Sequence, residues 1–131
     1  MFNKKKQPPI KSLIAEGSHI RGNIRFTDGL RIDGDVTGDI GANEDHGSLL
    51  VISESATVVG MVSADHILIN GSVKGPVFAQ HMLELQPKAR IEGDVQYAAL
   101  EMHQGALITG QLRPFLEGEE KPTLKLAANN P

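Results

Sequence analysis

One pattern of apolar residues, spaced by polar ones and closed by a glycine, occurs six times along the chain. One copy reads Leu50-x-Ile52-x-x-x-Ala56-x-Val58-x-Gly60-x-Val62, and a second form reads Leu30-x-Ile32-x-Gly34-x-Val36-x-Gly38-x-Ile40. The copies begin at Ser12 (the polar exception), Leu30, Leu50, Ile67, Leu83 and Leu100, at steps of 18, 20, 17, 16 and 17 residues. Repetition at this period is typical of a solenoid, in which each unit buries its apolar face against its neighbours.

Apolar and polar residues alternate within each copy, and a period of two is the period of a β-strand. A glycine at the same position of each copy indicates a bend or a close backbone approach. We therefore predict an all-β fold, a right-handed parallel β-helix of about six turns over residues 12–116. Residues 1–11 and 117–131 lack the pattern and are rich in Pro, Lys, Glu and Asn, so we expect two disordered tails.

Two other arrangements compete with this prediction. An antiparallel meander would use Asp28-Gly29 and Asn70-Gly71 as hairpin turns, but it does not require like residues at matched positions of successive strands. A left-handed helix would be indicated by a spacing of six residues, which is present at Ile14, Ile20, Phe26 and Ile32 and fails at Gly38. Uneven corners favour the right-handed form, and residues 41–48 are expected to form a loop at one corner.

Composition and charge limit the possible partners. The chain has 131 residues, a length typical of a single domain. It contains no cysteine, and no apolar run reaches the ~20 residues needed to span a bilayer. Residues 1–11 carry four lysines and no acid, whereas residues 12–116 carry seven basic and thirteen acidic residues. The acidic body offers no basic stripe for nucleic acid. The lack of cysteine is compatible with a cytoplasmic protein. No secretory signal is evident, because Lys4, Lys5 and Lys6 lead into Gln7-Pro8-Pro9 instead of an apolar stretch.

No catalytic constellation is evident in the sequence. Few of the five histidines fall at equivalent positions of the repeat; they are His19, His46, His66, His81 and His103. His66 and His81 each precede a copy by one or two residues and could stack, but a pair of stacked surface histidines does not make a metal site. We therefore expect no metal site, no catalytic residues and no cofactor. The phosphate-binding pattern G-x-x-x-x-G-K-[ST] is also absent from the sequence.

The N-terminal tail has an order that suggests membrane binding. Met1 and Phe2 could insert at a lipid interface while Lys4, Lys5 and Lys6 meet anionic headgroups. The alternative is a plain solvated leader, and the composition alone leaves both open.

The repeats, together with the MFNKKK start and the strings IRGNI, LRIDGDVTGDI and IEGDV, resemble the bactofilins, bacterial polymer-forming cytoskeletal proteins. The resemblance covers nearly the whole chain. It implies a right-handed β-helix and nucleotide-independent, end-to-end assembly into non-polar filaments. It also implies attachment of the N-terminal peptide to the inner face of the membrane and a scaffolding role for envelope or morphogenetic proteins. In that family a Phe of the final coil supports the end contact, and Phe115 falls at that position.

The residues point to polymerisation independently, because no capping helix is evident at either end of the predicted core and an uncovered solenoid end is an interface. The expected interface residues are Leu13, Ile14, Leu112, Phe115 and Leu116. The rival function is a β-helical enzyme, either a hexapeptide acyltransferase or a carbonic-anhydrase-like trimer. A weaker alternative is an adaptor that binds a partner through residues 41–48.

Overall fold

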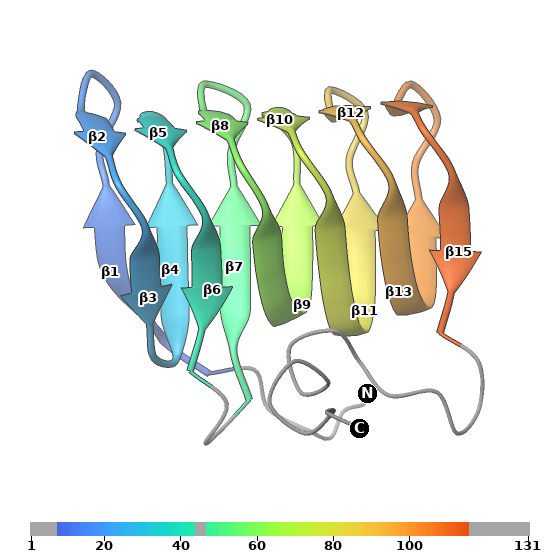
Figure 1. Cartoon of the computed structure of the whole chain (residues 1–131), viewed down its shortest axis with the longest axis horizontal. Coiled ribbons are helices and arrows are strands. Elements are labelled where there is room, and N and C mark those ends of the chain that lie inside the picture. The colour runs from blue at the N-terminus through green and yellow to red at the C-terminus, as the bar shows by residue number, and fades with distance from the viewer. Residues whose placement is uncertain (1–7, 44–46, 116–131) are drawn as a thin grey trace, which may run out of the picture.

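The computed structural model describes residues 8–43 and 47–115, and all of their regular structure is β-strand. The chain winds as a right-handed coil, rising along the back, crossing at the top and descending along the front in Figure 1. Six coils result, which are residues 10–26, 29–42, 49–64, 66–79, 82–97 and 99–114. The predicted parallel β-helix of about six turns is therefore confirmed. The described part of the chain contains no helix that could span a membrane.

Each coil contributes to three faces, which are named here from the view in Figure 1. The back face consists of β1 (Ile10–Ile14), β4 (Gly29–Ile32), β7 (Leu49–Ile52) and the second halves of β9 (Val62–Ile69), β11 (Val77–Leu85) and β13 (Val95–Met102). The top face consists of β2 (His19–Arg21), β5 (Asp35–Thr37), β8 (Thr57–Val59), β10 (Ser72–Lys74), β12 (Arg90–Glu92) and β14 (Leu107–Thr109). The front face consists of β3 (Ile24–Phe26), β6 (Ile40–Ala42), the first halves of β9, β11 and β13, and β15 (Leu112–Pro114).

All strand pairs are parallel, and their register matches the alignment of the sequence copies. On the back face the first residues of the six copies pair in one column: Ser12, Leu30, Leu50, Ile67, Leu83 and Leu100. The antiparallel meander is wrong, because β3 and β4, which flank Asp28-Gly29, pair with the next coil and not with each other. Asp28 instead has a φ of 70° in a corner, where its carboxylate meets Lys11 Nζ at 2.7 Å. Pairing of β1 begins at Ile10, two residues before the boundary predicted at residue 12.

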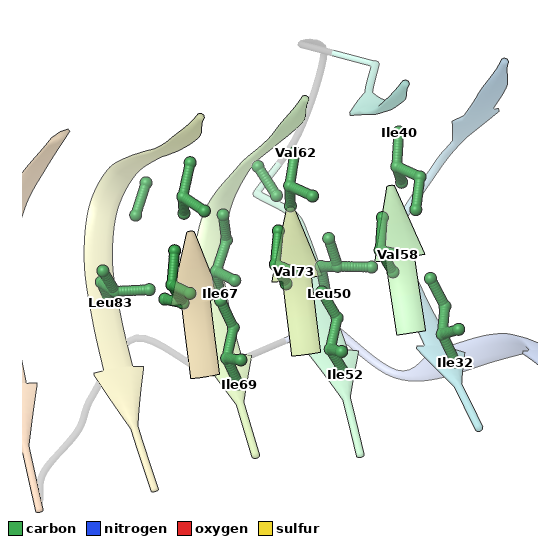
Figure 2. Close-up of a cluster of buried hydrophobic side chains, with 14 of the residues drawn as sticks. Ile32, Ile40, Leu50, Ile52, Val58, Val62, Ile67, Ile69, Val73 and Leu83 are labelled. Carbon is green, nitrogen blue, oxygen red and sulfur yellow. The ribbon is translucent and has the colours of Figure 1, made fainter. Parts of the chain in front are cut away.

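The core is a set of aliphatic rows that run along the solenoid axis. Figure 2 shows Ile32, Ile52 and Ile69 in one such row, and all three are fully buried. Like side chains pack over one another because each coil repeats the pattern of the previous one. Burial of each such side chain contributes about 1.5–3 kcal/mol, so the stability of the molecule is spread over many equivalent contacts.

A column of glycines forms the corner between the top and front faces. Gly60 has a φ of +147°, and an added Cβ there would lie 2.1 Å from the carbonyl oxygen of Gly38 in the coil before. The same clash recurs along the column at Gly38, Gly75, Gly93 and Gly110. The repeated glycine predicts a bend or a close backbone approach, and the structure shows both.

Candidate functional site: the two ends of the solenoid

The N-terminal end leaves the apolar row of the first coil uncovered. Ile14, Ile20 and Ile24 point inward, yet they are only half-buried, because no described coil precedes them. Their equivalents one coil later, Ile32, Val36 and Ile40, are almost completely buried. The end therefore has the shape of an internal coil surface that lacks its partner.

The C-terminal end is open in the same way. Leu112 and Met102 face inward in the sixth coil and remain 40% and 44% exposed, respectively. Leu100 and Ile108 complete this row and are half-buried. In the fifth coil the residue paired with Leu112 is Val95, which is only 1% exposed. Apolar surface is thus presented along the axis at both ends.

Both ends of the solenoid, as far as the structure describes the chain, consist of edge strands. In one sheet β1 and β3 lie at the N-terminal edge, and β15 and the second half of β13 lie at the C-terminal edge. In the other sheet the edges are β2 and β14. Edge strands carry rows of free N–H and C=O groups, which natural proteins normally cover or disrupt. Within residues 8–43 and 47–115 no element lies across either end. Each end therefore offers apolar contact and hydrogen-bonding capacity together.

Some of the predicted interface residues lie at the ends of the solenoid, and others do not. Ile14 and Leu112 lie at the two open ends, as expected. Leu13 does not, because it pairs with Arg31 in the outward column of the back face and is 58% exposed on the side of the solenoid. Phe115 is half-buried beyond β15, and its backbone N–H donates to the Tyr97 carbonyl oxygen at 2.8 Å. Leu116 lies outside the described residues, as do Met1, Phe2 and the lysines at positions 4–6.

The end surfaces also contain residues that were not among those predicted from the sequence, namely Ile20, Ile24, Leu100, Met102 and Ile108. The signal was present, because each occupies an apolar position of the first or last copy of the repeat. In a terminal coil the inward side chains lack a neighbouring coil on one side and are exposed there. The alternation that fills the core therefore also determines which side chains form the end surface.

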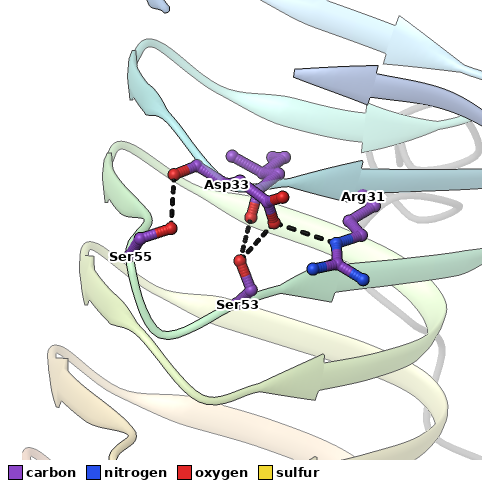
Figure 3. Close-up of polar contacts among 5 residues, drawn as sticks. Arg31, Asp33, Ser53 and Ser55 are labelled. Carbon is purple, nitrogen blue, oxygen red and sulfur yellow. Dashed lines mark hydrogen bonds and ion pairs between the residues drawn. The ribbon is translucent and has the colours of Figure 1, made fainter. Parts of the chain in front are cut away.

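The corners of the coils are closed by polar contacts, and Figure 3 shows those between the second and third coils. Arg31 Nε donates to Asp33 Oδ1 at 2.9 Å, and Ser55 Oγ donates to the Asp33 carbonyl oxygen at 2.8 Å. Ser53 Oγ contacts the Asp33 carboxylate and the Ile32 carbonyl oxygen. The Arg31 guanidinium, and after it the Ser53 hydroxyl, lowers the pKa of Asp33 below its ordinary value of 3.8. The contacts of the two serines fasten the third coil to the second from outside the core, whereas the Arg31–Asp33 pair lies within the second coil.

A shallow hollow lies on the outward side of the back face. Its lining is mainly apolar and consists of Leu49, Val51, His66, Ile67, Leu68, Met82 and Glu84. Its volume of about 220 Å³ is below the roughly 300–1,000 Å³ of typical small-molecule pockets. The ends of the solenoid, and not this hollow, are therefore the strongest candidates for a functional surface.

Residues 8–43 and 47–115 form a six-coil parallel β-solenoid, and no other described element covers its ends. Residues 12–113 match the family model described as "Bactofilin: Polymer-forming cytoskeletal". The chain belongs to the bactofilin family, which confirms the resemblance noted in the sequence.

A solved structure supports the same assignment. The chain is similar to the cytoskeletal bactofilin BacA, whose atomic structure was determined by solid-state NMR, with a TM-score of 0.66 and 27% sequence identity. The match covers 79% of this chain and 95% of that one. A search of curated proteins found no match. Family and fold together are those of a polymer-forming cytoskeletal protein and give no support to the rival enzymes.

Proposed function

We propose that this protein assembles end to end, without nucleotide, into non-polar filaments that attach to the inner face of the bacterial membrane and position envelope or morphogenetic proteins. The observation that carries the assembly is the pair of open ends. Each presents apolar rows and edge strands of the kind with which internal coils bind one another. A second copy stacked on an end continues both the core and the hydrogen-bond ladder.

The test of assembly compares two equally exposed apolar residues. Leu112 is 40% exposed at the C-terminal end, and Val59 is 41% exposed on the outward side of the top face. Leu112→Glu places a charge in the end contact and should stop filament growth, because an unpaired charge in an apolar interface is costly. Val59→Glu makes the same change on the side and should leave filaments intact. The measurement is electron microscopy of the tag-free protein in buffer without nucleotide.

Two results would contradict this assembly. Normal filaments from Leu112→Glu would exclude the end surface as the interface. Discrete trimers of the wild-type protein would instead favour the rival β-helical enzymes. Circular dichroism of both variants shows that any loss of filaments is not a loss of folding.

Membrane attachment is proposed from the N-terminal sequence. Lysines near an anionic surface contribute about 1 kcal/mol each, and burial of Phe2 adds roughly 1.5–3 kcal/mol. A gross sum of about 5 kcal/mol is too small to hold one copy once ordering costs are met, but many tails on one filament bind through avidity. The carriers are Met1, Phe2, Lys4, Lys5 and Lys6.

Flotation with anionic liposomes tests this attachment. Deletion of residues 2–6 should keep filaments but release them from the liposomes, and Phe2→Ser should weaken binding even at low salt. Truncated filaments that float as well as the wild type would mean that the tail is a solvated leader. Full flotation of the unassembled Leu112→Glu variant would refute the avidity argument while keeping the anchor.

A further inference from the structure

Three side chains that can bind a metal ion converge on the outward side of the back face, between the fifth and sixth coils. His103 Nε2 lies 3.2 Å from Glu84 Oε2 and 3.3 Å from Glu101 Oε2. The ligand atoms of all three residues lie within 4.8 Å of one another. Glu84 belongs to β11, Glu101 belongs to β13, and His103 follows β13 directly.

The strand register forces the two carboxylates together. Glu84 and Glu101 are paired across β11 and β13, so their side chains leave the sheet side by side. Like charges directly opposite each other destabilise a sheet. In the same column of the second coil stands Arg31, whose fixed positive charge pairs with Asp33. Among residues 8–43 and 47–115, the ion-pair partner of Glu84 and of Glu101 is His103 alone.

The three ligand atoms are close enough to share one ion. The two contacts of His103 Nε2, 3.2 Å and 3.3 Å long, join the residues as a hydrogen bond and ion pairs, and the same separations are compatible with ligation of a common metal ion. Ligands about 2.0–2.1 Å from a tetrahedral zinc ion are about 3.3–3.4 Å apart. Gln86 Nε2 also donates to Glu84 Oε2 at 3.1 Å, which orients that carboxylate as outer partners of metal ligands do.

We propose that Glu84, Glu101 and His103 form a binding site for a divalent first-row transition ion, with zinc as its test ion. One imidazole nitrogen and two carboxylate oxygens supply three ligands, and water completes the coordination. The imidazole ligand favours such an ion over Mg²⁺ or Ca²⁺, which prefer all-oxygen sites. The expectation of no metal site rested on the lack of converging histidines, whereas this site needs only one histidine.

The position of the site gives the ion a structural role. It joins the sixth coil to the fifth, and the second half of β13 is the outer edge of the back face at the C-terminal end. A bound ion would therefore hold the terminal coil, whose backbone is otherwise tied to the fifth coil by bonds such as His103 N–H to the Leu85 carbonyl oxygen at 2.9 Å. The proposal concerns the folded chain and does not depend on filament formation.

The test measures zinc on the tag-free full-length chain. Protein stripped with a chelator is dialysed against micromolar Zn²⁺, and bound metal per subunit is determined by elemental analysis. We expect one ion per subunit, at least tenfold weaker binding for Glu101→Gln and His103→Asn, and no effect of excess Mg²⁺. His81→Asn is the matched control, because His81 faces His66 with ring centroids 5.0 Å apart and forms the competing histidine pair.

A second readout follows the terminal coil directly. Zinc should slow hydrogen exchange at amides that bond the sixth coil to the fifth, such as His103 and Leu107, and leave the second coil unchanged. Equal zinc binding by the wild type and Glu101→Gln would overturn the site, and so would loss of binding only in His81→Asn. Absence of zinc from the wild type would show that the three residues form an ion pair alone. Circular dichroism confirms folding, and Glu101→Gln, on the exposed side, serves if His103→Asn unfolds.

Discussion

Replacement of Gly60 by alanine tests the close stacking of the coils. The residue has a φ of +147°, a conformation that residues with a Cβ rarely adopt. A Cβ built on this backbone lies 2.1 Å from the Gly38 carbonyl oxygen and 2.6 Å from its carbon. Neither backbone atom can move away without opening the ladder, in which Gly38 N–H donates to the Val59 carbonyl oxygen at 2.8 Å. Gly60→Ala should therefore separate the second and third coils locally.

The magnitude follows from two separate costs. The strained backbone conformation costs about 1–3 kcal/mol, and forcing a methyl group into a filled space costs about 1–3 kcal/mol more. The sum of about 2–6 kcal/mol is a large part of the roughly 5–15 kcal/mol that stabilises a typical domain. Gly22 is the matched control, because it has a φ of +130° but no atom within 4 Å of its added Cβ. Gly22→Ala should therefore incur only the conformational cost.

Urea unfolding, followed by circular dichroism, gives the free energy of unfolding of each variant. Sedimentation checks that the two variants are compared in the same state of assembly. Hydrogen exchange at the Gly38 amide reports the local opening. We expect Gly60→Ala to be less stable than Gly22→Ala by about 1–3 kcal/mol, with faster exchange at Gly38. Equal stabilities within about 0.5 kcal/mol and unchanged exchange would refute the argument that close backbone approach, and not only the bend, requires glycine in this column.

Three further predictions concern the core, the corner and the end. Ile69→Asp should abolish folding, because it places an unpaired charge at a fully buried position. Leu68→Asp, on the outward side of the same strand, should still fold. An unchanged circular dichroism melt of Ile69→Asp would contradict the strand register. Asp33→Asn should lower the melting temperature at pH 7. Its difference from the wild type should shrink as the pH falls below 3.8, because the contacts that lower the pKa of Asp33 stabilise the fold only while its carboxylate is charged. A constant difference would contradict that linkage. Phe115→Arg should leave the subunit folded but shorten or stop filaments in electron microscopy, and filaments of normal length would place Phe115 outside the contact.

The fold could be predicted from sequence because every coil repeats one pattern of inward residues. Alignment of the copies at Leu50, Ile67 and Leu83 gave the strand register directly, since parallel stacking places equivalent residues over one another. The position of the two ends followed from where the repeats stop. Leu13 lies near an end of the chain's repeats, but the pleat of β1 directs its side chain sideways and not along the axis, so proximity to an end is not enough to predict an end residue.

The cluster of Glu84, Glu101 and His103 shows which contacts the sequence repeat predicts and which it does not. The alignment of copies already placed Glu84 opposite Glu101, since each follows the first residue of its copy. His103 lies beyond the strand, in a corner whose path no alternation of apolar residues describes. Periodicity therefore predicts contacts within strands, whereas contacts at corners depend on the turn geometry that the structure supplies.

The number of coils fixes the length of one subunit along the solenoid axis. Neighbouring strands lie about 4.7–4.9 Å apart, so six coils advance about 29 Å along the axis. Copies stacked on one another would repeat every ~29 Å, and copies that alternate in direction would repeat every ~58 Å. Adding a single residue within a strand turns its inward side chains outward, whereas adding a whole coil lengthens the spacing by one step. The spacing of anything carried on such a filament is thus set in whole coils.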